Sequence, residues 1–219
     1  MNSPIIQLLV LAGIAVFLIL RLRGVLGTRE GYEKPAVTRP DPSRRSAPEF
    51  DVIEGGPDLD ITDHVPEDSD QAKALAAMKR VDPSFNVGEF LGGARGAYEM
   101  ILMAFEKGDL DQIVPFISED VYEAFASVVD DRQRQGLTVE ANFIGISDMS
   151  LVDAEFDEVT KEGEVSVRFK SEMTSVVRDN AGDIVEGSDK EIKRQKDTWT
   201  FSRRMDSGDP NWKLVATGE

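Results

Sequence analysis

The chain has 219 residues, one histidine, no cysteine and a formal net charge of −16, and these values exclude several kinds of site. Without cysteine there are no disulfides, zinc–thiolate sites or thiol nucleophiles. The excess of acidic side chains makes nucleic acid an unfavourable partner, because phosphates are bound by clustered lysine and arginine.

The chain begins with a strongly apolar stretch. Residues 1–20 carry no charged side chain, and a helix over residues 1–22 is just long enough to cross a bilayer core of about 30 Å. A cleaved signal peptide, the alternative, needs a basic segment before the run and a small-x-small site after it, whereas here Arg21 and Arg23 follow. We therefore expect residues 1–22 to form an uncleaved transmembrane anchor.

Basic residues dominate directly after this run. Residues 21–45 contain seven basic and three acidic side chains. By the positive-inside rule, the N-terminus then lies outside and the rest of the chain on the cytoplasmic side. The lack of cysteine agrees with this orientation, because exported domains often use disulfides.

Residues 23–70 have the composition of a linker. Six of the ten prolines fall within residues 24–70, and residues 49–70 hold nine acidic side chains and no lysine or arginine. Such a segment buries too little apolar surface to offset the entropy of ordering, so we expect it to be disordered. It is either a spacer or a binding segment, whose few apolar anchors would be Phe50, Val52, Ile53 and Leu59.

Helices are predicted in the first half of the domain, which we place at residues 71–219. A short amphipathic helix over residues 71–81 ends at Asp82-Pro83. A capping box at Asn86 and Glu89 opens a long helix that ends at Gly108. A short helix interrupted at Pro115 and a helix capped by Ser118 follow. The apolar positions of the long helix recur at spacings of three and four: Val87, Phe90, Leu91, Ala94, Tyr98, Ile101, Leu102 and Phe105.

From residue 137 the apolar period becomes two. The alternation changes face after Phe143, which predicts a bulge near Gly145. Helices followed by antiparallel strands predict an α+β fold, in which helices pack on the concave face of a curved sheet. The later strands are expected at residues 164–178, 192–204 and 211–217, with a turn at 179–182.

The sequence contains no recognisable catalytic or metal-binding arrangement. The single histidine, His64, lies in the predicted linker without the scaffold that a metal site requires, and its position there excludes a Ser-His-Asp triad in the domain. No pair of carboxylates occupies apolar strand positions. Burial at such positions would raise the pKa of one carboxyl group, which could then act as a general acid. We therefore expect no enzymatic activity, no cofactor and no metal.

Three glycines, Gly92, Gly93 and Gly96, interrupt the predicted long helix around Arg95. A phosphate-binding loop would stand between a strand and a helix, so that interpretation fails. Each glycine costs about 1 kcal/mol relative to alanine inside a helix. We expect another element to approach this helix face closely, and the alternative is a binding groove formed by these four residues.

Two other groups of side chains can each be interpreted in two ways. The aromatic residues Trp199, Phe201 and Trp212 are expected to pack in the core, and otherwise would line a ligand pocket under the sheet. Basic residues interspersed with acidic ones on one strand are expected to form a solvated, partly ion-paired face: Lys190, Lys193, Arg194 and Lys196.

Five runs of residues carry a resemblance to a known family. They are, in chain order, Phe90-Leu-Gly-Gly-Ala-Arg-Gly-Ala-Tyr98, Val121-Tyr-Glu-Ala-Phe125, Val165-Ser-Val-Arg-Phe169, Asp197-Thr-Trp-Thr-Phe201-Ser-Arg203 and Pro210-Asn-Trp-Lys-Leu214. With them, residues 85–219 resemble the Tim44-like domain family, named after a peripheral subunit of the mitochondrial inner-membrane protein translocase. The apolar segment and acidic linker ahead of the domain resemble those of bacterial TimA-type proteins.

This resemblance implies a fold of the nuclear-transport-factor-two type and a non-enzymatic adaptor at a bacterial inner membrane. The implied partners are the membrane and other proteins, namely a heat-shock chaperone or a translocase component. The family's membrane contact falls on the first helices of the domain, which here implies Leu75, Met78, Lys79 and Arg80. One departure weakens the chaperone implication: residues 24–83 are short and acidic where the mitochondrial protein has a long helical region.

Two other functions remain open. A small-molecule pocket of the ketosteroid-isomerase type predicts a cavity with a convergent acidic or polar group. A ribosome tether predicts a basic face, whereas residues 46–160 hold 26 acidic and 7 basic side chains and so sum to −19.

Overall fold

The computed structural model describes residues 58–218, so the predicted anchor and residues 23–57 of the predicted linker lie outside the described part of the chain. Within residues 58–218, no helix has both the length and the apolar character needed to span a bilayer. The helices are α2 (Leu59–Thr62), α3 (Asp70–Val81), α4 (Val87–Lys107), the 3-10 helix η1 (Asp111–Phe116) and α5 (Glu119–Arg134). The strands are β1 (Thr138–Phe156), β2 (Glu162–Arg178), β3 (Ile184–Arg204) and β4 (Lys213–Gly218).

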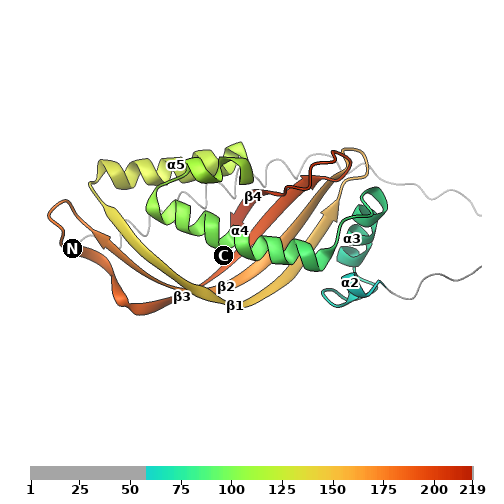
Figure 1. Cartoon of the computed structure of the whole chain (residues 1–219), viewed down its shortest axis with the longest axis horizontal. Helices are drawn as coiled ribbons and strands as arrows, with labels where there is room; N and C mark the ends of the chain where they lie inside the picture. Colours follow the sequence, from blue (N-terminus) through green and yellow to red (C-terminus); the bar gives the residue numbers. More distant parts are fainter. Residues whose placement is uncertain (1–57, 219) are drawn as a thin grey trace, which may run out of the picture. The chain divides into compact units, whose positions relative to one another are not determined.

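The strands form one antiparallel sheet in the order β1-β2-β3-β4. The sheet is curved, and α4 lies across its concave side (Figure 1). Both α3 and α4 pack against β1. The predicted α+β architecture, with helices on a curved antiparallel sheet, is confirmed.

The helix ends follow the capping signals in the sequence. The Ser69 hydroxyl accepts a hydrogen bond from Ala72 N at 3.1 Å, and Asn86 Oδ1 accepts one from Glu89 N at 2.8 Å. At its other end α4 stops at Gly108, whose φ of 73° lies in the left-handed region that glycine adopts without strain. These caps place α3 and α4 within one residue of their predicted bounds.

The strand register confirms the predicted bulge and corrects one boundary. Phe143 pairs with Met173 and Gly145 with Glu172, so the ladder shifts between Phe143 and Gly145. β3, however, begins at Ile184, eight residues before the predicted start. Its first residues pair with the end of β2, and this cross-strand pairing outweighs their weak local strand signal.

Residues 58–69 are also ordered, in contrast to the predicted disorder of the linker. Ile61 and Val65 are buried against the core, with exposed fractions of 4% and 8%. The Asp60 carboxylate accepts hydrogen bonds from Val87 N at 2.8 Å and Gly88 N at 3.0 Å. Its charge stabilises the N-terminus of α4, so an acidic composition is compatible with order here.

The core lies between α4 and the concave face of the sheet. Alternate residues of β2 and β3 point into it, among them Phe169 and Trp199. Tyr98 of α4 stacks on Phe169, with ring centroids 4.3 Å apart, and lies 4.6 Å from the Trp199 ring. The predicted core role of Trp199 and Phe201 agrees with their exposed fractions of 4% and 2%.

We predict that Trp199→Ala lowers the free energy of unfolding by about 3–5 kcal/mol, because it leaves a cavity beneath α4 that the neighbouring rings cannot fill. Urea unfolding of the full chain measures this loss. Val159→Ala, at a residue that is 91% exposed, is the control and should change stability by less than about 0.5 kcal/mol. Equal effects of the two substitutions would contradict the assignment of Trp199 to the core.

Candidate functional site

The residues that the sequence singled out do not form one site. Leu75, Met78, Trp199 and Phe201 are buried in the core. Lys79 and Trp212 are half-buried, and the remaining candidates are exposed: Arg80, Gly92, Gly93, Arg95 and Gly96. In this conformation, only these five exposed residues are free to contact a membrane or a partner.

Lys79 joins α2 to α3. Its ammonium group lies 2.7 Å from carboxylate oxygens of both Asp58 and Asp60. Burial alone would lower the pKa of Lys79, but the hydrogen bonds to the two carboxylates outweigh it and raise that pKa. Burial likewise would raise the pKa of Asp60, yet Lys79 and the two backbone N–H groups hold it below its usual value. Lys79 is thus committed to ion pairs inside the domain.

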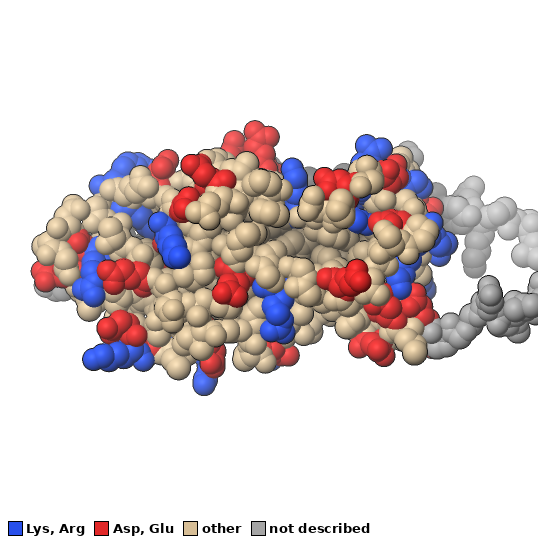
Figure 2. Space-filling view, in the orientation of Figure 1, with Lys and Arg blue, Asp and Glu red and all other residues tan. Residues whose placement is uncertain are grey.

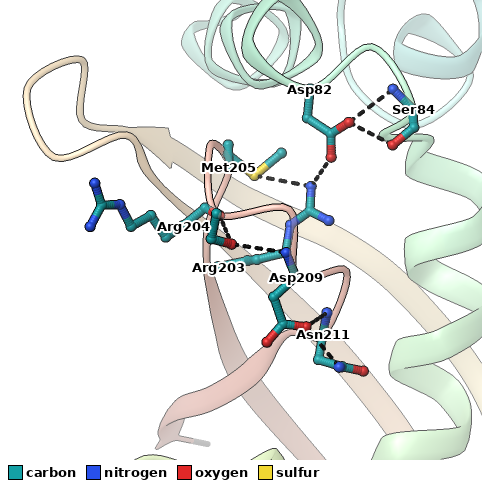
Figure 3. Close-up of polar contacts among 8 residues, drawn as sticks. Asp82, Ser84, Arg203, Arg204, Met205, Asp209 and Asn211 are labelled. Carbon is teal, nitrogen blue, oxygen red and sulfur yellow. Dashed lines mark hydrogen bonds and ion pairs between the residues drawn. The ribbon is translucent and has the colours of Figure 1, made fainter.

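A second polar cluster fastens the end of α3 to the end of β3. The Arg203 guanidinium forms an ion pair with Asp82, and Asp82 Oδ1 accepts hydrogen bonds from Ser84 N at 3.0 Å and from the Ser84 hydroxyl at 2.5 Å (Figure 3). Arg203 is 9% exposed. The hydrogen bonds from Ser84, followed by the Arg203 charge, hold the pKa of Asp82 below its usual value despite partial burial.

Aromatic rings surround the same guanidinium. Its central carbon lies 5.3 Å from the Trp212 ring centroid and 5.9 Å from that of Phe85. Trp212 in turn lies 4.7 Å from Phe90 of α4. Cation–π contacts and the ion pair together make this corner a structural junction of α3, α4 and β3. The sequence prediction missed it because Asp82 was interpreted only as a helix stop.

A polar cluster that the sequence prediction also missed lies beneath α4. The Tyr98 hydroxyl donates to Asp197 Oδ2 and lies 2.8 Å from the Ser171 hydroxyl, while Gln195 Nε2 donates to the Tyr98 oxygen at 3.2 Å. Burial, and then the hydrogen bond to Asp197, raise the pKa of Tyr98 above its usual range. Gln195, Asp197 and the buried Trp199 are alternate residues of β3, so their side chains point to the same face of the sheet. This spacing was the sequence signal from which the cluster could have been predicted.

This tyrosine cluster is the convergent polar group that a pocket of the ketosteroid-isomerase type would need. Yet Tyr98 is fully buried, and its hydroxyl is engaged by all three partners. A general acid or base must reach a substrate proton, which a fully enclosed phenol cannot do. The arrangement therefore favours a role in holding α4 on the sheet.

The glycines of α4 lie on the helix face that points away from the sheet. A Cβ atom added at Gly92, Gly93 or Gly96 would meet no heavy atom within 4 Å. The expectation that another element approaches this face is thus wrong for the described residues, because the sheet contacts the opposite side of α4. We call Gly92, Gly93, Arg95 and Gly96 the glycine face.

A hollow of about 180 Å³ lies between α5 and residues 108–111, which follow α4. No group of three or more acidic, histidine or cysteine side chains in residues 58–218 is arranged to hold a metal ion. The hollow is lined by Gly108, Asp109, Leu110, Asp111, Tyr122, Ala126, Val129, Asp130 and Gln133.

Comparison with known proteins gives one consistent family. The family model described as "Tim44-like domain" matches residues 71–219. Human "Mitochondrial import inner membrane translocase subunit TIM44" is 25% identical over 151 residues, which are 67% of this chain and 33% of that protein. Subunit TIM44-1 of Arabidopsis thaliana is 23% identical over 148 residues, 66% of this chain and 30% of that protein. The chain therefore spans about a third of the length of these relatives.

Among solved structures, the intermembrane space region of chloroplast protein ARC6 matches with a TM-score of 0.40 and 10% sequence identity. The match covers 58% of this chain and 94% of that one. A likeness of this size supports no conclusion about function.

We predict that Asp82→Asn lowers the free energy of unfolding by about 2–4 kcal/mol at pH 7, because it leaves the Arg203 charge buried without its partner. The pKa of Asp82 is lowered in the folded state, so its contribution is complete above the unfolded-state value of about 3.9 and is lost as the pH falls through the lower folded value. Urea unfolding at pH 7 and at pH 3 measures the difference, which should shrink in acid. The exposed Asp68→Asn is the control, and a pH-independent loss in Asp82→Asn would contradict this account.

We also predict that Gly92→Ala, Gly93→Ala and Gly96→Ala each raise the free energy of unfolding by about 0.5–1 kcal/mol, because alanine restricts the unfolded chain and its methyl group meets open space. Thermal unfolding of each variant measures the gain. Gly108→Ala is the matched control and should be destabilising, since φ is 73° and the new Cβ would lie 3.2 Å from Val129. Loss of stability at the glycine face would reveal a contact within the chain.

Proposed function

Because this chain belongs to the Tim44-like domain family, we propose that it is a non-enzymatic adaptor that presents a protein-binding domain at a bacterial inner membrane. The observation that carries the proposal is the match of the family model to residues 71–219, which is nearly the whole described domain. The human and plant relatives are named as subunits of a mitochondrial inner-membrane import translocase. Protein transport is therefore the process in which we place the adaptor.

Attachment to the membrane is assigned to residues 1–22, with the domain on the cytoplasmic side. The apolar run and the seven basic side chains of residues 21–45 support this orientation. We assign residues 23–57 the role of a tether. A tethered domain has an effective concentration of about 1 mM for partners within reach, a function that requires no catalysis.

The partner is proposed to be a chaperone or a translocase component. The family model matches the folded domain, residues 71–219. We therefore place the partner surface within the domain. The glycine face of α4 is the candidate, since it is exposed and no described residue packs on it. Figure 2 shows uncharged atoms together with several acidic and basic side chains across the middle of the view, where Figure 1 places α4.

The proposal predicts that crosslinking of the full-length protein in intact cells captures a protein partner, identified by mass spectrometry. Deletion of residues 1–23 should abolish capture and release the chain from the membrane fraction. Capture of a chaperone or secretion component only by the anchored form would support the adaptor. A retained small molecule with no protein partner would favour a ligand pocket instead.

A variant with alanine at Gly92, Gly93 and Gly96 tests the partner surface independently of the membrane anchor. Its added methyl groups should leave the domain folded and attached but reduce crosslinking at least fivefold. Arg134→Ala, at an exposed residue of α5, is the matched surface control. Unchanged capture by the alanine variant would remove the glycine face from the proposal and leave the adaptor role intact.

A further inference from the structure

A short segment at the start of the described chain is bound to the surface of the helices. It comprises Asp58, the four-residue helix α2 and the turn that follows, and we call residues 58–65 the strap. The strap packs on α3 and α4 and precedes residues 71–219, the part of the chain that the family model matches. The surface beneath it therefore already holds a peptide segment, and we call that surface the strap site.

The strap site binds a carboxylate through two kinds of group. The Asp60 carboxylate accepts hydrogen bonds from Val87 N at 2.8 Å and Gly88 N at 3.0 Å, which are N–H groups of the first turn of α4 that no helical carbonyl reaches. Lys79 Nζ of α3 lies 2.7 Å from the same carboxylate. The ammonium group and the N-terminus of α4 both favour a negative charge at this point.

Two apolar side chains complete the contact of the strap. Ile61 and Val65 are 4% and 8% exposed and belong to the core cluster. Val65 N donates to the Ile61 carbonyl oxygen at 3.1 Å, so the two residues lie one helical turn apart. The strap site thus recognises a carboxylate followed directly by an apolar residue, with a second apolar residue four positions later.

The contacts that hold α3 and α4 in place are made largely without the strap. Ser69 caps α3 through a hydrogen bond from Ala72 N, and Asn86 accepts a hydrogen bond from Glu89 N at the start of α4. The stacking of Tyr98 on Phe169 fastens α4 to the sheet. Residues 66–68, which join the strap to α3, are exposed. The strap can therefore leave its site while both helices keep a cap and α4 stays on the sheet.

We propose that the strap site is a docking site for a short acidic and apolar segment of a partner protein, and that the strap occupies it until such a partner displaces it. A segment joined to its own site has an effective concentration of about 1 mM, so it competes strongly with partners in solution. Occupation by the strap lowers the apparent affinity for every partner and so restricts docking to tight or concentrated ones. The strap site is a second partner surface of the proposed adaptor, and this inference rests on that function.

Anionic lipid is the other ligand that a lysine beside a helix N-terminus attracts. Residues 58–70, however, carry six acidic side chains and no lysine or arginine, and they stay attached to the domain when the strap leaves, so they repel an anionic surface. The spacing of Ile61 and Val65 by one turn is also a feature of a helical peptide, which a lipid does not have. These observations favour a polypeptide.

The test uses the full-length protein in a neutral detergent and a blocked peptide with the sequence of residues 58–66. Ile61→Asp should free the strap site, and this variant should bind the peptide at least tenfold more tightly than the unmodified chain. Bound peptide should slow hydrogen exchange of the Val87 and Gly88 amides, which donate to Asp60 in the strap. Val159→Asp, at a residue that is 91% exposed, is the matched control and should bind the peptide as the unmodified chain does.

Further variants separate release of the strap from damage to the domain. Asp60→Asn, which weakens the strap without placing a charge in the core, should also tighten peptide binding. A peptide that carries the same Asp60→Asn change should bind at least tenfold more weakly than the parent peptide. In the Ile61→Asp background, Lys79→Glu should weaken binding by about tenfold, whereas Lys73→Glu, on the exposed side of the same helix, should change it less than twofold.

Several results would overturn the proposal. These are equal peptide binding by the unmodified chain and both strap variants, equal effects of Lys73→Glu and Lys79→Glu, or no protection of the Val87 and Gly88 amides. Phosphatidylglycerol vesicles that protect these amides where the peptide does not would assign the site to lipid, and pairing of unmodified with Ile61→Asp chains would make a second copy the occupant. If the peptide fails while cellular crosslinking still captures a protein, the strap site is wrong and the adaptor stands.

Discussion

The domain depends on the way α4 is held across the concave face of the sheet. Tyr98 is fully buried between Phe169 and Trp199, and its hydroxyl meets Asp197, Ser171 and Gln195. Aromatic burial alone is tolerant of small shifts, but a buried hydroxyl without partners costs about 1–3 kcal/mol. The tyrosine cluster therefore fixes which turn of α4 lies over which strand residue.

The position of α4 on the sheet also sets the contacts that its two ends make. At its N-terminus, Phe90 reaches Trp212, whose ring also contacts the Arg203 guanidinium, and Asp60 binds the first backbone N–H groups. At its C-terminus, Gly108 turns the chain into η1 and α5. The fixed register also leaves the glycine face pointing outward, so the fold itself gives those residues no packing role.

The sequence predicted what depends on neighbours in the chain. Ser69, Asn86 and Gly108 gave the bounds of α3 and α4, and alternation gave the strands and the bulge near Gly145. It could not predict contacts between residues far apart in the chain. Arg203 and Asp82 are 121 residues apart, and Tyr98 and Asp197 are 99 apart. The early start of β3 and the order of residues 58–69 likewise depend on partners elsewhere, namely the end of β2 and the N-terminus of α4. The candidate site residues chosen from the sequence therefore included core residues such as Leu75 and Met78.

An anchored adaptor can work through a weak partner surface. An effective concentration of about 1 mM lets a weak site be occupied by partners at the same membrane. Weak contacts also dissociate quickly, which suits an adaptor that handles successive clients. The buried tyrosine cluster holds α4 on the sheet, and so keeps the exposed glycine face in a fixed position for such contacts.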